Sequence, residues 1–157
     1  MSLPEDLRVA ILREAEGHGG PRGGMLEALR MIQQAEGWVS DAHLAECAEL
    51  LGVPTAELEG LATFYSLIFR KPVGDTVILL CDAASCWMSG ADAVRDALMQ
   101  RLGIGFGETT EDGRFTLLNI CCVGGCDRAP AAVVGPDRKL MGPLSADAID
   151  ELLEGAS

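Results

Sequence analysis

The sequence has few basic residues, with 12 Lys and Arg against 24 Asp and Glu and a formal net charge of -12. A surface that binds nucleic acid or anionic lipid needs an excess of cationic side chains to neutralise phosphates. The charge balance therefore argues against nucleic acid as a partner. Because the acidic residues are spread along the chain, we interpret them as a solvated surface and infer no partner from them.

A secretory signal and long apolar runs are also missing. The first six residues contain no basic segment and lead into no apolar core, as a signal peptide would. No apolar stretch approaches the roughly 20 residues needed to span a bilayer. We therefore expect a cytoplasmic protein that reaches a membrane only through partners, with no direct membrane insertion.

Motifs for cofactors that carry a hydride are absent too. Neither residues 103–107 nor residues 17–24 form a G-x-G-x-x-G motif between a strand and a helix, and no phosphate-binding Lys loop occurs. Cys-x-x-Cys is absent, and both histidines lie in the N-terminal half, away from most cysteines. The sequence predicts no catalytic residue and no NADH or FMN site of its own, so electrons must come from another protein.

The N-terminal half has the pattern of a helical bundle. Apolar residues at helical spacing predict one helix after Pro4 and another around residues 25–35, separated by a Gly- and Pro-rich loop over 17–24. Ser40 is the predicted N-cap of a third helix that ends at Gly52, and Thr55 the predicted cap of a fourth. Cys47 lies on the apolar stripe of the third helix, which predicts a core role for its thiol.

From residue 76 the pattern changes to that of a mixed sheet. A β-branched apolar run over 76–81 predicts a strand. We expect it to be followed by a helix over 91–102, a strand over 114–121, a hairpin of strands 131–134 and 139–141 turning over 135–138, and a helix over 145–154 capped by Ser145. Strand, helix, strand predicts a parallel crossover. The fold class is α+β, with a helical domain over 1–73 and an α/β domain over 74–157 that is compatible with a thioredoxin-like sandwich.

Four cysteines stand where the two predicted parallel strands give way to loops. Cys81 and Cys86 are separated by four residues, and Cys122 and Cys126 by three. Parallel strands joined by a crossover end at the same edge of a sheet, so the two loops converge. Without a signal peptide, cysteines are more typical of metal ligands than of disulfides. The sequence predicts four thiolates around one site.

The spacing favours a [2Fe-2S] cluster over zinc. A four-residue spacer is one of those that two-iron ferredoxins use, whereas structural zinc sites have two to four residues between paired cysteines, so zinc is permitted, but neither loop has the common two-residue form. A structural zinc module for protein interaction stays as the alternative. Gly124 and Gly125 lack a Cβ, which allows backbone N–H groups to approach the sulfurs. Four residues also lie between Cys121 and Cys126, as between Cys81 and Cys86, so spacing does not choose between Cys121 and Cys122.

Distinctive segments occur in both halves of the chain. They are Ala-Leu-Arg-Met-Ile-Gln-Gln over 28–34, Gly37-Trp38-Val39, Gly-Leu-Ala-Thr-Phe-Tyr-Ser over 60–66, Phe-Arg-Lys-Pro-Val-Gly over 69–74, Cys-Asp-Ala-Ala-Ser-Cys over 81–86, Thr109-Thr110, Asp-Gly-Arg-Phe-Thr-Leu over 112–117 and Cys-Cys-Val-Gly-Gly-Cys over 121–126. On these segments, nearly the whole chain resembles the small iron–sulfur subunit (NuoE type) of proton-pumping NADH:quinone oxidoreductase, respiratory complex I.

The resemblance implies a thioredoxin-like C-terminal domain with one [2Fe-2S] cluster on Cys81, Cys86, Cys122 and Cys126, and so favours Cys122 over Cys121. It implies an electron-transfer subunit that exchanges an electron with FMN of an NADH-binding flavoprotein subunit (NuoF type), beside a large iron–sulfur subunit (NuoG type). The complex would be peripheral to the inner membrane. Similar subunits of NAD-dependent formate dehydrogenases and NAD-linked hydrogenases are the alternative.

Two aromatic features extend this expectation. Trp87 departs from the family pattern, and we expect it either to shield the cluster or to pack. The Ala-Thr-Phe-Tyr element over 62–65 is either core or a docking surface, and we favour the core.

Overall fold

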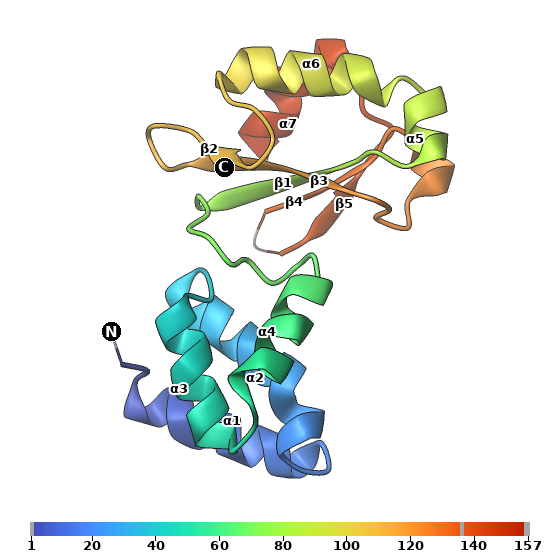
Figure 1. Ribbon diagram of the computed structural model, residues 1–157. Helices are drawn as coiled ribbons and strands as arrows, with labels where there is room; N and C mark the ends of the chain where they lie inside the picture. Colours follow the sequence, from blue (N-terminus) through green and yellow to red (C-terminus); the bar gives the residue numbers. More distant parts are fainter. Residues whose placement is uncertain (1, 136, 156–157) are drawn as a thin grey trace. The chain divides into compact units, whose positions relative to one another are not determined.

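The computed structural model describes residues 2–135 and 137–155. These residues form two compact units that divide between Pro72 and Val73, whereas the predicted boundary follows Val73. The first unit is a bundle of helices and the second a sheet with helices packed on it (Figure 1). The prediction of an α+β fold with an N-terminal helical bundle is confirmed.

The helical unit consists of four consecutive helices among its described residues. They are α1 (Glu5–Gly17), α2 (Pro21–Glu36), α3 (Asp41–Leu51) and α4 (Thr55–Phe64). Each helix turns an apolar stripe inward, and the fully buried side chains include Ile11, Leu29, Ile32, Leu44 and Leu58. Burial of one such side chain contributes about 1.5–3 kcal/mol, so this shared core is the main stabilising element of the bundle.

The predicted loop over 17–24 is wrong in its second half. Helix α2 begins at Pro21, which suits the first helical position because its missing N–H would have no partner there. Gly23 and Gly24 lie inside the helix. A Cβ on Gly23 would lie 2.0 Å from the His18 carbonyl oxygen, and one on Gly24 would lie 2.5 Å from Ala15 Cα. These glycines allow α1 and α2 to approach closely, so they do not mark a break.

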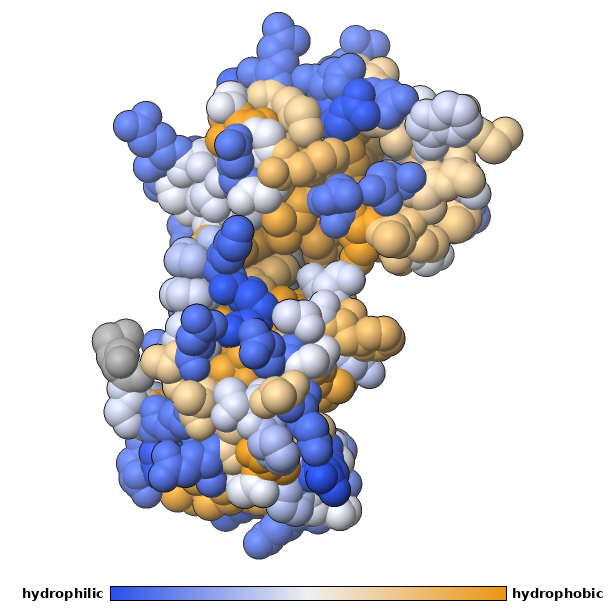
Figure 2. Space-filling model, in the orientation of Figure 1, coloured by the Kyte–Doolittle hydropathy of each residue, from blue (hydrophilic) through white to orange (hydrophobic). Residues whose placement is uncertain are grey.

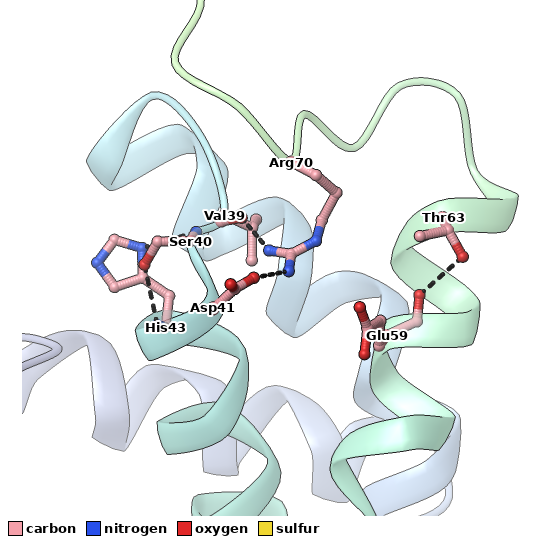
Figure 3. Close-up of polar contacts among 7 residues, drawn as sticks. All are labelled: Val39, Ser40, Asp41, His43, Glu59, Thr63 and Arg70. Atoms are coloured by element: carbon pink, nitrogen blue, oxygen red, sulfur yellow. Dashed lines mark hydrogen bonds and ion pairs between the residues drawn. The ribbon is translucent and has the colours of Figure 1, made fainter.

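Helix α3 has the predicted cap. Ser40 Oγ accepts the His43 backbone N–H at 3.1 Å, and His43 Nδ1 accepts the Ser40 N–H at 3.4 Å (Figure 3). Gly52 ends the helix in the left-handed conformation. The prediction for Thr55 is off by one residue, because Pro54 occupies the cap position and Thr55 is the first helical residue.

Polar side chains hold the segment that follows α4. Gln33 donates through Nε2 to the Leu67 carbonyl at 2.9 Å and accepts the Phe69 N–H. Arg70 donates to the Val39 carbonyl and to Asp41, and Figure 3 shows its guanidinium reaching toward both. In the same view, Thr63 Oγ1 donates to the Glu59 carbonyl at 2.9 Å within α4.

The core interpretation of the Ala-Thr-Phe-Tyr element is wrong for its aromatic residues. Ala62 is buried, but Phe64 is 78% exposed and Tyr65 is also exposed, with the two rings in an edge-to-face pair 5.3 Å apart. The buried residues of α4 are Leu58 and Ala62, whereas Phe64 and Tyr65 lie at the end of the helix, beyond these buried positions.

The second unit contains a five-stranded sheet of order β2-β3-β1-β4-β5. Its strands are β1 (Thr76–Cys81), β2 (Glu108–Thr109), β3 (Phe115–Ile120), β4 (Ala132–Val134) and β5 (Lys139–Met141). β1 and β3 are parallel, and Thr76 pairs with Phe115 and Cys81 with Ile120. The predicted crossover and hairpin are confirmed, although Pro136 of the predicted turn lies outside the described residues. The short β2 was not predicted.

Helices α6 (Ala91–Leu102) and α7 (Ile149–Gly155) cover one face of the sheet (Figure 1). α6 has the predicted bounds. The final helix begins later than predicted, because a 3₁₀ turn over Ala146–Ala148 precedes it and Ser145 makes no side-chain cap. A five-residue helix, α5 (Ala84–Met88), was not predicted because it is too short to show a period.

Candidate metal centre

The C-terminal ends of the parallel strands β1 and β3 bring four cysteines to one edge of the sheet. Cys81 is the last residue of β1, and Cys86 lies in α5 immediately after it. Cys122 lies in the loop that follows β3, and Cys126 begins the short 3₁₀ helix η1 (Cys126–Arg128). Because Cys81 pairs with Ile120 in the parallel register, both loops leave the sheet together, as Figure 1 shows at the end of the sheet where α5 lies.

Cys81 and Cys86 form a buried pair. Each residue is only 1% exposed, and they pack with Ala91 and Ala131 under a partly buried Leu140. Burial raises the pKa of Cys86, and a hydrogen bond with the Cys81 thiol raises it further. The Cys81 thiol also donates to the Cys121 carbonyl at 3.7 Å, which ties the first loop to the second.

Cys122 and Cys126 form an exposed pair. Their sulfurs are 3.9 Å apart. Two thiolates on one tetrahedral metal with bonds of about 2.3 Å are separated by about 3.8 Å, so this distance suits a shared ion. The hydrogen bond between the two thiols raises the pKa of Cys126. The pairs also act on each other, because charge on Cys81 raises the pKa of Cys126 and charge on Cys126 raises that of Cys86.

Hydrogen-bond donors surround the sulfurs. The Gly124 N–H donates to Cys122 Sγ at 3.4 Å, from a backbone with φ of +79° that favours glycine. The Ala131 backbone lowers the pKa of Cys86 and the Ser85 side chain lowers that of Cys126, each through a hydrogen bond that favours the thiolate. Sequence reasoning missed Ser85 and Ala131. Only the position of Ser85 beside Cys86 hinted at a role.

Gly125 is small for a different reason. A Cβ there would lie 2.9 Å from Leu140 Cδ1 and 3.4 Å from the Ala131 Cβ. The loop that holds the exposed pair therefore rests directly on β5 and on the residue before β4. Glycine at 125 is needed for this close approach, while glycine at 124 is needed for a backbone conformation.

The remaining two cysteines play other parts. The backbone carbonyl of Cys121 accepts a hydrogen bond from the Cys81 thiol, and the Cys121 side chain is exposed. Cys47 is buried in α3, where burial raises its pKa to about 12 and keeps the thiol neutral, in agreement with the predicted core role.

The arrangement of donors is pairwise. Over residues 2–135 and 137–155, no three Cys, His, Asp or Glu side chains converge as a single ion would require. A structural zinc ion needs four ligands around one point, whereas a two-iron cluster needs two thiolates on each iron. The two pairs supply the four thiols, two for each iron, that a [2Fe-2S] cluster requires.

Comparison with known proteins agrees with this geometry. Residues 11–157 match the model of the thioredoxin-like [2Fe-2S] ferredoxin family. The chain belongs to this family. The family match also confirms the predicted thioredoxin-like fold of the second unit.

Relatives of the family cover almost the whole chain. The E subunit of NADH-quinone oxidoreductase from Pseudomonas aeruginosa is 43% identical over 97% of this chain and 90% of its own length. The corresponding protein from Escherichia coli K12 is 44% identical over 94% of this chain and 87% of its own length. This family relationship extends through the helical unit as well as the sheet unit.

A solved structure shares the fold. The crystal structure of an air-oxidized NAD+-reducing [NiFe]-hydrogenase matches with a TM-score of 0.70 and 30% identity, over 85% of this chain and 22% of the hydrogenase chain. Among the described residues of the present chain, no helix has both the length and the apolar character that crossing a bilayer requires.

Proposed function

We propose that this chain is the [2Fe-2S] electron-transfer subunit of the NADH dehydrogenase module of an NADH-quinone oxidoreductase, with Cys81, Cys86, Cys122 and Cys126 as the cluster ligands. One observation carries the proposal. Two thiol pairs meet at one sheet edge in a chain that aligns over 97% of its length, at 43% identity, with an NADH-quinone oxidoreductase component.

The residues divide the work of holding such a cluster. When bound, a [2Fe-2S] cluster supplies a one-electron acceptor. The buried Cys81 and Cys86 fix its position from a strand end and a helix, and the exposed Cys122 and Cys126 keep its other side near the surface. The N–H of Gly124 offsets negative charge on a ligand sulfur, which favours the reduced state.

The electron donor is a separate subunit, because the sequence has no motif for NADH or FMN. We assign this role to the FMN- and NADH-binding flavoprotein subunit, with a large iron–sulfur subunit beside it. The location that fits is cytoplasmic and peripheral to the inner membrane, through these partners.

A second parent complex is favoured by one observation. The match to an NAD+-reducing hydrogenase covers 85% of this chain, so an NAD-linked hydrogenase or formate dehydrogenase is the alternative assembly. Neighbouring genes separate the two, because membrane subunits for quinone reduction accompany one assembly and hydrogen- or formate-oxidising subunits the other.

The function is tested in the assembled complex. We expect Cys81→Ser to remove the cluster, slow flavin reoxidation and raise peroxide output, because the flavin loses a one-electron acceptor. Cys121→Ser serves as the matched control and leaves all three unchanged. Unchanged flavin reoxidation and peroxide output in a Cys81→Ser complex that lacks the cluster would contradict the proposed role.

A further inference from the structure

Helix α5 presents two large apolar side chains to solvent beside the metal centre. Trp87 is 62% exposed and Met88 is 79% exposed, while the preceding Cys86 faces inward and is buried. Figure 2 shows apolar and pale surface at the end of the sheet unit where α5 lies, in contrast to the hydrophilic outer side of α6. Trp87 is therefore not part of a core, and the expectation that it packs within the chain is wrong.

The indole of Trp87 hydrogen-bonds to a neighbouring carboxylate. Its Nε1 donates to Asp92 Oδ2 at 3.1 Å, and the other oxygen of Asp92 accepts from Arg95 at 2.6 Å. The polar tip of the indole is thus satisfied within the chain, while its ring remains open to solvent. Exposed Trp side chains are typical anchors of protein interfaces, because they offer a large apolar area on a side chain with only two rotatable bonds.

Charges around this surface are mainly negative. Residues 81–96 and 119–130 contain four carboxylates and two arginines and no lysine. Both arginines are paired with carboxylates, Arg95 with Asp92 and Asp96 and Arg128 with Asp127. A partner that covers this surface would therefore carry a basic rim.

We propose that Trp87 and Met88 anchor the flavoprotein subunit, by entering an apolar pocket with a basic rim on that subunit. This inference rests on the proposed function and identifies the docking surface that it needs. The occupant follows from position, because α5 carries Cys86, the proposed ligand, and Ser85 of the same helix hydrogen-bonds to the exposed Cys126 of the second pair. A protein docked here lies against the metal centre, as an electron donor must.

The test measures binding of the full chain, loaded with its cluster, to the purified NADH- and FMN-binding subunit of the same complex. We expect Trp87→Ala to weaken binding about 30-fold or more, as for a central Trp anchor. Trp87→Phe keeps apolar volume but loses the Asp92 contact, so its loss is smaller. Val9→Ala truncates another exposed apolar side chain, 54% exposed on α1, and leaves binding unchanged. Higher ionic strength weakens binding of every variant.

Iron content and the reduced-state EPR signal are measured on each variant, so that a lost cluster is not mistaken for lost docking. Trp87→Ala with an intact cluster and wild-type affinity would overturn the docking surface and leave the proposed function standing. A wild-type chain that holds its cluster but does not bind the flavoprotein would overturn both.

Discussion

The two thiol pairs of the metal centre differ in almost everything except residue type. Cys81 and Cys86 are sealed among alanines and come from a strand end and a helix, whereas Cys122 and Cys126 lie exposed in a loop. The difference suggests a division of roles. Under the proposed function, the buried pair would set where a cluster sits relative to the sheet, and the exposed pair would close the site on its solvent side.

The largest effect should separate the two pairs. We expect Cys86→Ser to lower iron content at least about tenfold, because the residue is only 1% exposed and water does not reach it to replace the lost thiolate. Cys122→Ser should lose less iron, since solvent or a serine oxygen reaches the exposed position. Iron per chain after anaerobic purification measures both. Equal iron losses in the two variants would show that the buried and the exposed pair do not differ in how they hold the metal.

The support under the exposed pair is tested next. We expect Gly125→Ala to destabilise the sheet unit by about 1 kcal/mol, because its Cβ would lie 2.9 Å from Leu140 Cδ1 and the Leu140 side chain would have to move. Gly60→Ala, in α4 with nothing within 4 Å of its Cβ, should stabilise the chain by about 0.5–1 kcal/mol. Denaturant unfolding of the two variants gives both values. A neutral Gly125→Ala would show that the loop does not rest on β5.

Cys47 serves as an internal control for burial without a metal. Its pKa is raised to about 12 in the folded state, so the folded chain keeps a proton that the unfolded chain loses above its ordinary pKa of 9.0. Stability from Cys47 is present below pH 9 and falls as the pH rises toward 12. We expect Cys47→Ala to show a shallower loss of stability between pH 9 and pH 11 in denaturant unfolding. An identical slope in both proteins would contradict this assignment.

The smallest effect concerns the helical unit. Ser40→Ala should cost about 1 kcal/mol by removing the cap of α3. Iron content should not change, because the cap lies in the other unit. A parallel loss of iron, seen by the same iron assay, would show that cluster retention depends on the helical unit's stability.

Long regular elements were predicted well from the sequence, whereas short elements and tertiary contacts were not. The bounds of β1 and α6 were predicted because β-branched runs and helical periods extend over enough residues to be recognised. The convergence of the thiols followed from the parallel crossover. In contrast, α5 and β2 are too short to carry a period, and the role of Gly23 and Gly24 depends on tertiary packing that no local pattern shows.

The site shows the same limit. The sequence predicted that Cys81, Cys86, Cys122 and Cys126 share one site, but not which of them are buried, and their spacing did not choose between Cys121 and Cys122. The 3.9 Å contact between the sulfurs of Cys122 and Cys126 supports Cys122. The exposure of Trp87 could not be predicted either, because a single Trp after Cys86 is compatible with both a core and a surface position.

The most direct test is iron and acid-labile sulfide analysis of anaerobically purified protein, with visible and EPR spectra before and after dithionite. We expect two irons and two sulfides per chain and an EPR signal that appears on reduction. Stoichiometric zinc in colourless, sulfide-free protein that was produced with iron available would contradict it.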